Sequence, residues 1–275
     1  MPTAYVNGVE LYYEVTGDGF PLVFSHEYAG DYRSWEPQAR FFSRRYKVVT
    51  YNHRGFPPSG VPTDPGAYSQ DILIEDLYQL LRYLQISTAH IAGLSMGANV
   101  ALNFGLRHPE MCTSLVVAGC GAGSVNPEQF AQEMKDVVEH LEKVGMREFA
   151  ELFSQGPARV QFRRKDSRGW YEFRKQLAEH SAIGSTLIMK GVQLRRPSIF
   201  LLKATLKELQ VPTLLLIGDE DEACIEPTIF MKRHIPRAGL AVFPQSGHAI
   251  NLEEPDFFNC VMQDFLTKVE IRKWE

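Results

Sequence analysis

The sequence contains few cysteines, no excess of positive charge and no long hydrophobic run. Its 275 residues include four cysteines without a C-x-x-C pair, which argues against both a disulfide framework and a zinc ribbon. The 29 Lys and Arg residues are outnumbered by 33 Asp and Glu residues, so the formal net charge of −4 gives no global attraction to nucleic acid or anionic lipid. The longest apolar stretches, such as residues 214–217, are far shorter than the ~18 residues that cross a bilayer. We therefore expect a soluble protein that binds neither nucleic acid nor membranes.

The first residues also lack the features of a secretion signal. The first basic residue is Arg33, and Glu10 and Glu14 precede it, so no basic segment leads into an apolar one. Together with unpaired, reduced thiols, this predicts a cytoplasmic protein. The sequence has no cluster of metal ligands, no phosphate-binding glycine-rich loop and no aromatic and basic stacking platform. We therefore expect no metal and no cofactor, and a small molecule as the substrate.

Hydrophobic residues make up 44% of the chain, enough for a substantial core, and they follow two alternating patterns. Short unbroken apolar runs are typical of strands buried on both faces of a parallel sheet. Between them, apolar residues at three- and four-residue spacing indicate helices, as in 72–84 and 257–269. Strand followed by helix, repeated, predicts an α/β fold: a mostly parallel twisted sheet with helices on both faces. The expected strands include residues 22–24, 47–51, 90–93, 114–117, 213–217 and 240–243.

Two segments depart from this alternation. At the start, residues 4–6 and 9–13 flank Asn7-Gly8, which predicts an antiparallel hairpin at the edge of the sheet. Between about residues 124 and 207 no strand-like run occurs, and the pattern indicates helices. We therefore predict a core domain formed by residues 1–123 and 208–275, with a helical cap inserted at 124–207. Such a cap would lie over the strand ends, where open α/β sheets bind their ligands.

A glycine-flanked serine follows one of the expected strands. Gly93-Leu94-Ser95-Met96-Gly97 has the pattern G-x-S-x-G and precedes a helical period at 98–107. In this context the serine can sit on a tight, strained turn, because only glycines allow the backbone to crowd that closely. The following helix directs its free N–H groups and its positive end to the same point. Ser95 is therefore a candidate nucleophile, and an ordinary N-cap serine is the alternative.

Two other strand ends supply the partners that a nucleophilic serine needs. A serine hydroxyl is a weak nucleophile at neutral pH, so it requires a histidine base and an acid that fixes the tautomer of that histidine. Gly218-Asp219-Glu220-Asp221 directly follows the expected strand that ends at residue 217. Ser246-Gly247-His248 follows the expected strand that ends at residue 243, and His248 completes the chain order serine, acid, histidine.

These motifs resemble the α/β-hydrolase fold superfamily, specifically its serine hydrolases with a helical cap. The resemblance spans nearly the whole chain outside the insertion, and it includes Asn52-His53-Arg54-Gly55-Phe56-Pro57-Pro58-Ser59, which is similar to the family's Arg-Gly-x-Gly-x-Ser loop. In that family the acid usually stands three residues after the strand-end glycine, which implies Asp221 rather than Asp219. Dehalogenases and epoxide hydrolases of this fold carry aspartate at the elbow, so Ser95 implies carbonyl chemistry.

The resemblance also implies an oxyanion hole formed by the backbone N–H groups of Tyr28 and Met96. Relatives typically carry His-Gly-x after the corresponding strand, whereas this sequence has His26-Glu27-Tyr28. A carboxylate at Glu27 would either point away from the pocket or repel anionic substrates. We expect His26 to hold this loop in place rather than to act as a base.

Several side chains are further candidates for contact with a substrate. Glu27 belongs to residues 26–28, which we name the oxyanion loop, and Trp35 follows shortly after it in the sequence. Trp170 belongs to a group of cap aromatics that either line a pocket or pack the cap onto the core. The cap also contains a basic stretch from Arg159 to Lys175, which we interpret as a solvated helix face. The alternative is that one of its arginines binds a substrate carboxylate.

Together these residues predict a serine hydrolase. His248 would take the proton from Ser95, Asp221 would orient and stabilise the imidazolium, and Ser95 would attack a carbonyl to give an acyl-enzyme. A small carboxylic ester or lactone is the preferred substrate. Hydrolytic cleavage of a C–C bond in a vinylogous diketone, and thioesterase or perhydrolase-like activity, would use the same triad. A ligand-binding or receptor member of the fold, without turnover, is the alternative from a different functional class.

Overall fold

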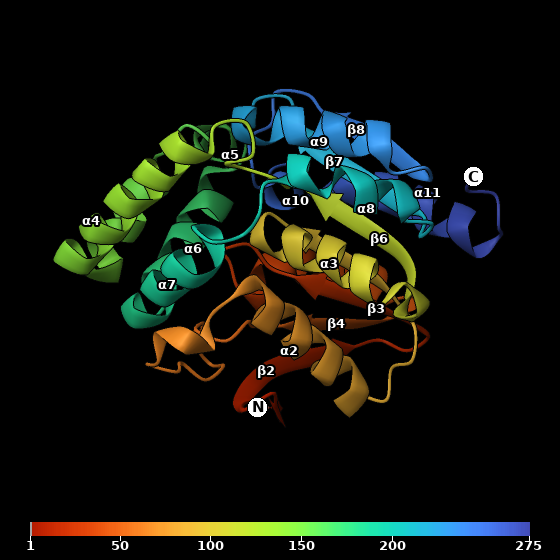
Figure 1. Ribbon diagram of the computed structural model, residues 1–275, viewed down its shortest axis with the longest axis horizontal. Helices are drawn as coiled ribbons and strands as arrows, with labels where there is room; N and C mark the ends of the chain where they lie inside the picture. Colours follow the sequence, from red (N-terminus) through yellow and green to blue (C-terminus); the bar gives the residue numbers. More distant parts are fainter. Residues whose placement is uncertain (1) are drawn as a thin grey trace.

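The computed structural model describes residues 2–275 and contains an eight-stranded sheet in the order β1-β2-β4-β3-β5-β6-β7-β8 (Figure 1). The strands are β1 (Thr3–Val6), β2 (Val9–Thr16), β3 (Phe20–Ser25), β4 (Tyr46–Tyr51), β5 (Ala89–Leu94), β6 (Cys112–Ala118), β7 (Thr213–Gly218) and β8 (Ala238–Phe243). β1 pairs antiparallel with β2, and β2 pairs antiparallel with β4. All other neighbours are parallel, which confirms the predicted α/β fold.

Helices cover both faces of the sheet. They are α1 (Glu36–Phe42), α2 (Gln70–Tyr83), α3 (Met96–Arg107), α4 (Pro127–Phe153), α5 (Val160–Lys165), α6 (Ser167–Ala178), α7 (Ala182–Ile188), α8 (Lys203–Glu208), α9 (Glu222–His234), α10 (Ile250–Glu253) and α11 (Pro255–Glu270). Side chains alternate across each strand, so that in β3 Leu22 and Phe24 join a core cluster with α1 and α11. Val23 joins the opposite cluster, which includes residues of α2, α3, α8 and α9.

The predicted N-terminal hairpin is present. β1 and β2 are paired with Val6 opposite Val9. The two residues between them, Asn7 and Gly8, have φ angles of 48° and 75°. Two successive positive φ angles are what a two-residue type I′ turn requires, and Asn-Gly is the sequence that adopts them most readily. The antiparallel edge of the sheet therefore follows directly from this dipeptide.

The chain between β6 and β7 is helical. Helices α4 to α7, coloured green to teal, lie together beyond one end of the sheet, on the side to which β6 points (Figure 1). Their buried residues, among them Leu141 and Phe149, join the same core cluster as α2 and α3. Helix α8 ends at Glu208 and so extends across the predicted boundary at residue 207. The division into a core and a cap at 124–207 remains a prediction.

Neither disulfides nor membrane helices are found in the described part of the chain. All four cysteines are free thiols, and Cys260 is the exposed one. Among residues 2–275 no helix combines the length and the apolar character that would let it span a bilayer.

Candidate active site

Ser95 lies on a sharp turn between β5 and α3. Its backbone has φ 55° and ψ −110°, a strained conformation for a residue with a side chain. The flanking glycines make the turn possible, because a Cβ atom at Gly93 would lie 2.3 Å from the carbonyl oxygen of Gly97, and one at Gly97 would lie 2.1 Å from the carbonyl oxygen of Ser25. The close backbone contacts therefore leave no room for a side chain at positions 93 and 97, as expected from the sequence.

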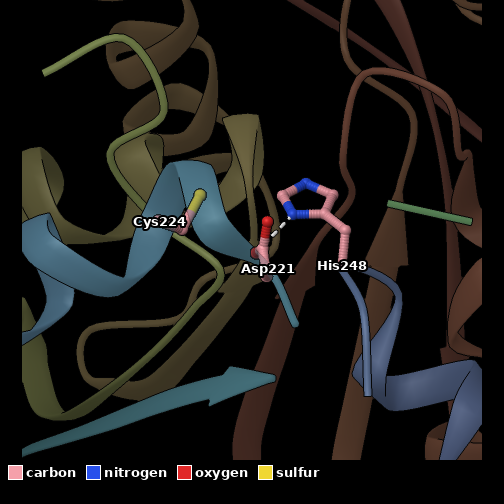
Figure 2. Close-up of side chains that lie close together, drawn as sticks. All are labelled: Asp221, Cys224 and His248. Atoms are coloured by element: carbon pink, nitrogen blue, oxygen red, sulfur yellow. Dashed lines mark hydrogen bonds and ion pairs between the residues drawn. The ribbon is translucent and has the colours of Figure 1, made fainter. Parts of the chain in front are cut away.

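Asp221 and His248 form a hydrogen-bonded pair at the ends of β7 and β8. The Nδ1 atom of His248 lies 2.7 Å from Oδ2 of Asp221. An ionised carboxylate only accepts, so the proton of the neutral imidazole stands on Nδ1 and leaves Nε2 as an acceptor. Figure 2 shows this second ring nitrogen directed away from Asp221. The backbone N–H of His248 also donates to the carbonyl of Ala158, at 3.1 Å, which links the His248 loop to the helical insertion.

The electrostatics of this pair suit an acid–base role. Burial alone would lower the pKa of His248, but the charge of Asp221 and the hydrogen bond to it outweigh burial and raise the pKa above 6.5. Burial would raise the pKa of Asp221, but the charge of His248 and its hydrogen bond lower it overall. The carboxylate therefore stays ionised at neutral pH and stabilises a proton on the ring.

Ser95, Asp221 and His248 line one cavity of about 340 Å³. Residues of the helical insertion, including Phe153 and Met189, form part of its wall. Within residues 2–275 the structure has no hydrogen bond between the Ser95 hydroxyl and the His248 ring. The structure thus joins two members of the predicted triad by a hydrogen bond and brings the third to the same cavity.

Glu27 does not stand free in the oxyanion loop. Its carboxylate accepts hydrogen bonds from both terminal nitrogens of Arg159, one of them at 3.0 Å, and the two residues are 2% and 3% exposed. Arg159 precedes α5, so this buried ion pair joins the oxyanion loop to the insertion. The prediction that the basic stretch is a solvated face is therefore wrong for Arg159, whose guanidinium also lies over the rings of Phe153 and Phe173.

His26 holds the oxyanion loop, as expected. Its Nε2 accepts the backbone N–H of His53 at 3.0 Å, so Nδ1 carries the proton and donates to the carbonyl of Glu27 at 2.7 Å. Burial lowers the pKa of His26 to about 4, which keeps the ring neutral. Tyr28 follows in the same loop, and both Glu27 and Tyr28 line the cavity.

The two tryptophans predicted to contact substrate lie elsewhere. Trp35 is 1% exposed and packs between Phe24 and Phe258 in the core on the α1 and α11 face of the sheet. Trp170 lies within the insertion, where its Nε1 donates to the carbonyl of Ser154 at 2.7 Å. Neither lines the cavity that contains Ser95. The prediction for Trp35 rested on its proximity in sequence to the oxyanion loop. That proximity does not fix where the side chain lies, because the chain after the end of β3 can direct its residues to either face of the sheet.

Cys224 forms a small cluster with Asp221 and His248. It lies in the first turn of α9, next to Asp221 (Figure 2), and its thiol donates to the carbonyl of Gly119 at 3.3 Å. Ligand atoms of Asp221, Cys224 and His248 all lie within 4.8 Å of one another, close enough to hold a metal ion. Burial raises the pKa of Cys224 well above 9.0, however, so the thiol is protonated and acts as a hydrogen-bond donor. The cluster fits an acid–base pair with a neighbouring thiol better than a metal centre.

Sequence reasoning missed three residues of the cavity region. Cys224 could have been found from its spacing, since a residue three positions after the helix N-cap Asp221 lies on the same side of the first turn. The burial of Arg159 and the place of Arg196 in the cavity wall have no such signal, because charged residues in a polar helical segment look alike whether they face solvent or a cavity.

Comparison with known proteins agrees with this architecture. The protein-family model described as alpha/beta hydrolase fold matches residues 21–255 of the chain. The chain is 25% identical to a putative carbamate hydrolase, RutD, of Azorhizobium caulinodans, over 98% of this chain and 100% of the relative. It is 26% identical to 3-oxoadipate enol-lactonase 1 of Acinetobacter baylyi, over 90% of this chain and 89% of the relative. The solved structure of a thermophilic esterase from Thermogutta terrifontis matches with a TM-score of 0.85 at 24% identity, covering 98% of both chains.

Proposed function

Since the chain belongs to the alpha/beta hydrolase fold family, we propose that it is a serine hydrolase that cleaves small carboxylic esters or lactones through an acyl-enzyme on Ser95. The observation that carries the proposal is the Asp221–His248 hydrogen bond of 2.7 Å at the cavity that Ser95 also lines. An acid that fixes the tautomer of a histidine, at a cavity that a serine on a strained turn also lines, is the arrangement that activates a hydroxyl.

The proposed reaction has two halves. Nε2 of His248 takes the proton of the Ser95 hydroxyl as Oγ bonds to the carbonyl carbon, and the backbone N–H groups of Tyr28 and Met96 donate to the oxyanion. The tetrahedral intermediate then expels the alcohol, which receives the proton from His248. Water attacks the acyl-enzyme with His248 again as base, and the carboxylic acid leaves. Asp221 stays ionised throughout and stabilises the imidazolium.

The cavity and the relatives favour a small ester or lactone. At about 340 Å³ the cavity is near the lower end of ligand pockets, which span about 300–1,000 Å³, so a long acyl chain would not fit inside it. One relative is named an enol-lactonase, and a structural neighbour is an esterase. We also propose that residues 124–207 act as a cap over this site, because the carbonyl of Ala158 holds the backbone of His248 and Arg159 holds Glu27.

A substrate panel tests the bond class. We expect 4-nitrophenyl acetate and butyrate, and a small lactone, to be hydrolysed by the wild-type protein, with lower kcat/KM for the laurate ester and no cleavage of a vinylogous diketone. Ser95→Ala should lower kcat for the esters by about 10⁵- to 10⁶-fold. Turnover of the diketone alone, or of long-chain esters alone, would contradict the proposed substrate class. Equal rates in the wild type and Ser95→Ala would contradict the proposed nucleophile.

A further inference from the structure

Arg196 is a cation of the cavity wall, and it has no carboxylate partner among residues 2–275. One terminal nitrogen, Nη2, donates to the carbonyl of Ala122 at 2.8 Å. The other, Nη1, is buried and has no hydrogen-bond partner within residues 2–275. The guanidinium carbon lies 5.8 Å from the centre of the Phe130 ring. A buried guanidinium nitrogen without a partner is costly, so its presence beside a cavity points to an anion that the chain itself does not supply.

The other charged groups of the cavity already have partners. Glu27 is paired with Arg159, and Asp221 is hydrogen-bonded to His248. The titratable groups that act on Arg196 are the thiols of Cys120 and Cys224, and burial raises the pKa of Cys120 to about 12 and that of Cys224 well above 9.0. Both thiols are therefore neutral at physiological pH. Burial lowers the pKa of Arg196 and outweighs the opposing effect of the two thiols, and the charge of a bound carboxylate would raise the pKa again.

Arg196 lines a second cavity as well as the one that Ser95 lines. A second, smaller cavity of about 50 Å³ shares Ala122, Phe130, Gln193 and Arg196 with the main one. Gln193 is 7% exposed, and within the described residues its side-chain oxygen has no hydrogen-bond partner either. Arg196 and Gln193 thus line both cavities. The unpartnered Oε1 of Gln193 only accepts hydrogen bonds, so it is the amide nitrogen of Gln193 that can donate to an anion beside Nη1 of Arg196.

We propose that the site is selective for esters or lactones that carry a free carboxylate, and that Arg196, with Gln193 beside it, binds this carboxylate while the scissile carbonyl lies at Ser95. This inference rests on the proposed function, because it names the substrate class of the same site. Arg159 cannot take this role, since its guanidinium is occupied by Glu27 and covered by two aromatic rings. A guanidinium suits the task because its planar fork donates two parallel hydrogen bonds to a carboxylate.

The test compares two esters of equal acyl length, mono-4-nitrophenyl adipate and 4-nitrophenyl hexanoate, after correction for spontaneous hydrolysis. We expect the wild type to have the higher kcat/KM on the acidic ester. Arg196→Met should lower the ratio of the two kcat/KM values by roughly 10- to 100-fold, mainly through KM of the acidic ester, as expected for the loss of a charged hydrogen bond. Arg196→Lys should restore part of the preference for the acidic ester, because lysine keeps the positive charge but lacks the two parallel donors of the guanidinium.

Arg195→Met is the matched control. Arg195 is the exposed neighbour of Arg196, so this variant removes the same charge from the chain without changing the cavity wall, and the ratio should stay at the wild-type value. A ratio that is unchanged in Arg196→Met, or that falls equally in Arg195→Met, would overturn the inference while leaving the hydrolase proposal intact.

A binding experiment tests the carboxylate site at Arg196 separately from the proposed hydrolysis. Calorimetry should show that the Ser95→Ala variant binds monomethyl adipate more tightly than methyl hexanoate. This preference should vanish in the double variant that carries both Ser95→Ala and Arg196→Met. This preference does not depend on turnover, so it would support the carboxylate site even if both nitrophenyl esters proved inert and the proposed hydrolysis failed. Equal binding of the two methyl esters would contradict the carboxylate site.

Discussion

Asp221→Asn is expected to lower kcat by about 10⁴-fold on any ester that the protein cleaves. The carboxylate of Asp221 accepts a hydrogen bond from Nδ1–H of His248, at 2.7 Å, which leaves Nε2 without a proton and able to take the proton of Ser95. An asparagine amide group can donate to Nδ1 instead, which places the ring proton on Nε2, where it blocks that transfer. The variant also removes the negative charge that stabilises the imidazolium. Steady-state kinetics on 4-nitrophenyl butyrate measures the loss.

Asp219→Asn is the matched control for this prediction. Asp219 is exposed, and its Oδ1 accepts the backbone N–H of Ser246 at 3.2 Å, a bond that the carbonyl oxygen of asparagine can replace. Its kcat should stay within about threefold of the wild type, since exposed substitutions usually change free energies by about 0.5 kcal/mol or less. If Asp219→Asn lost more activity than Asp221→Asn, the acid of the triad would have to be reassigned.

Breaking the Glu27–Arg159 ion pair should destabilise the protein strongly. Each partner is almost fully buried, so Glu27→Gln leaves an unpaired guanidinium and Arg159→Met leaves an unpaired carboxylate. Removing one partner of a buried pair costs about 3–5 kcal/mol of unfolding free energy, whereas removing both costs far less. We therefore expect the double variant to be more stable than either single variant, as measured by urea unfolding.

An exposed ion pair provides the comparison. Lys268 and Asp264 lie on α11 with side chains 46% and 62% exposed, so Asp264→Asn should change the unfolding free energy by less than about 1 kcal/mol. If the effects of Glu27→Gln and Arg159→Met simply added in the double variant, the two side chains would not be coupled. The link between the oxyanion loop and the helical insertion would then have to rest on other contacts.

The sequence predicted the parts of this protein that local rules determine. Asn7-Gly8 specifies the hairpin turn, and the glycines at 93 and 97 specify the turn at Ser95, because in each case one backbone geometry excludes most residues. The parallel sheet followed from unbroken apolar runs, since a strand buried on both faces has no polar alternation. Asp221 and His248 could be predicted to lie together because polar residues after parallel strands meet at the same edge of the sheet, and the two side chains are hydrogen-bonded.

The sequence could not predict which side chains the insertion turns inward. Arg159 lies in a basic stretch, yet it is buried because Glu27, 132 residues earlier in the chain, supplies its counter-charge. Trp35 looked like a pocket residue, but it faces the core on one side of the sheet. The burial of these side chains depends on contacts between segments that are distant in sequence, and no local sequence pattern predicts those contacts.

In the proposed mechanism His248, held by Asp221, activates Ser95. Labelling by a fluorophosphonate, located by mass spectrometry and followed from pH 5 to 9, tests it most directly. Only the neutral ring can accept the Ser95 proton, and the pKa of His248 lies above 6.5, so the labelling rate should be low in acid and rise as pH passes that raised pKa. If His248 activates Ser95, the wild type carries a single adduct, on Ser95. This adduct is absent from the Ser95→Ala variant and nearly absent from the His248→Ala variant. An adduct on another residue, no adduct at all, or labelling of Ser95 at an unchanged rate in His248→Ala would contradict the proposed mechanism.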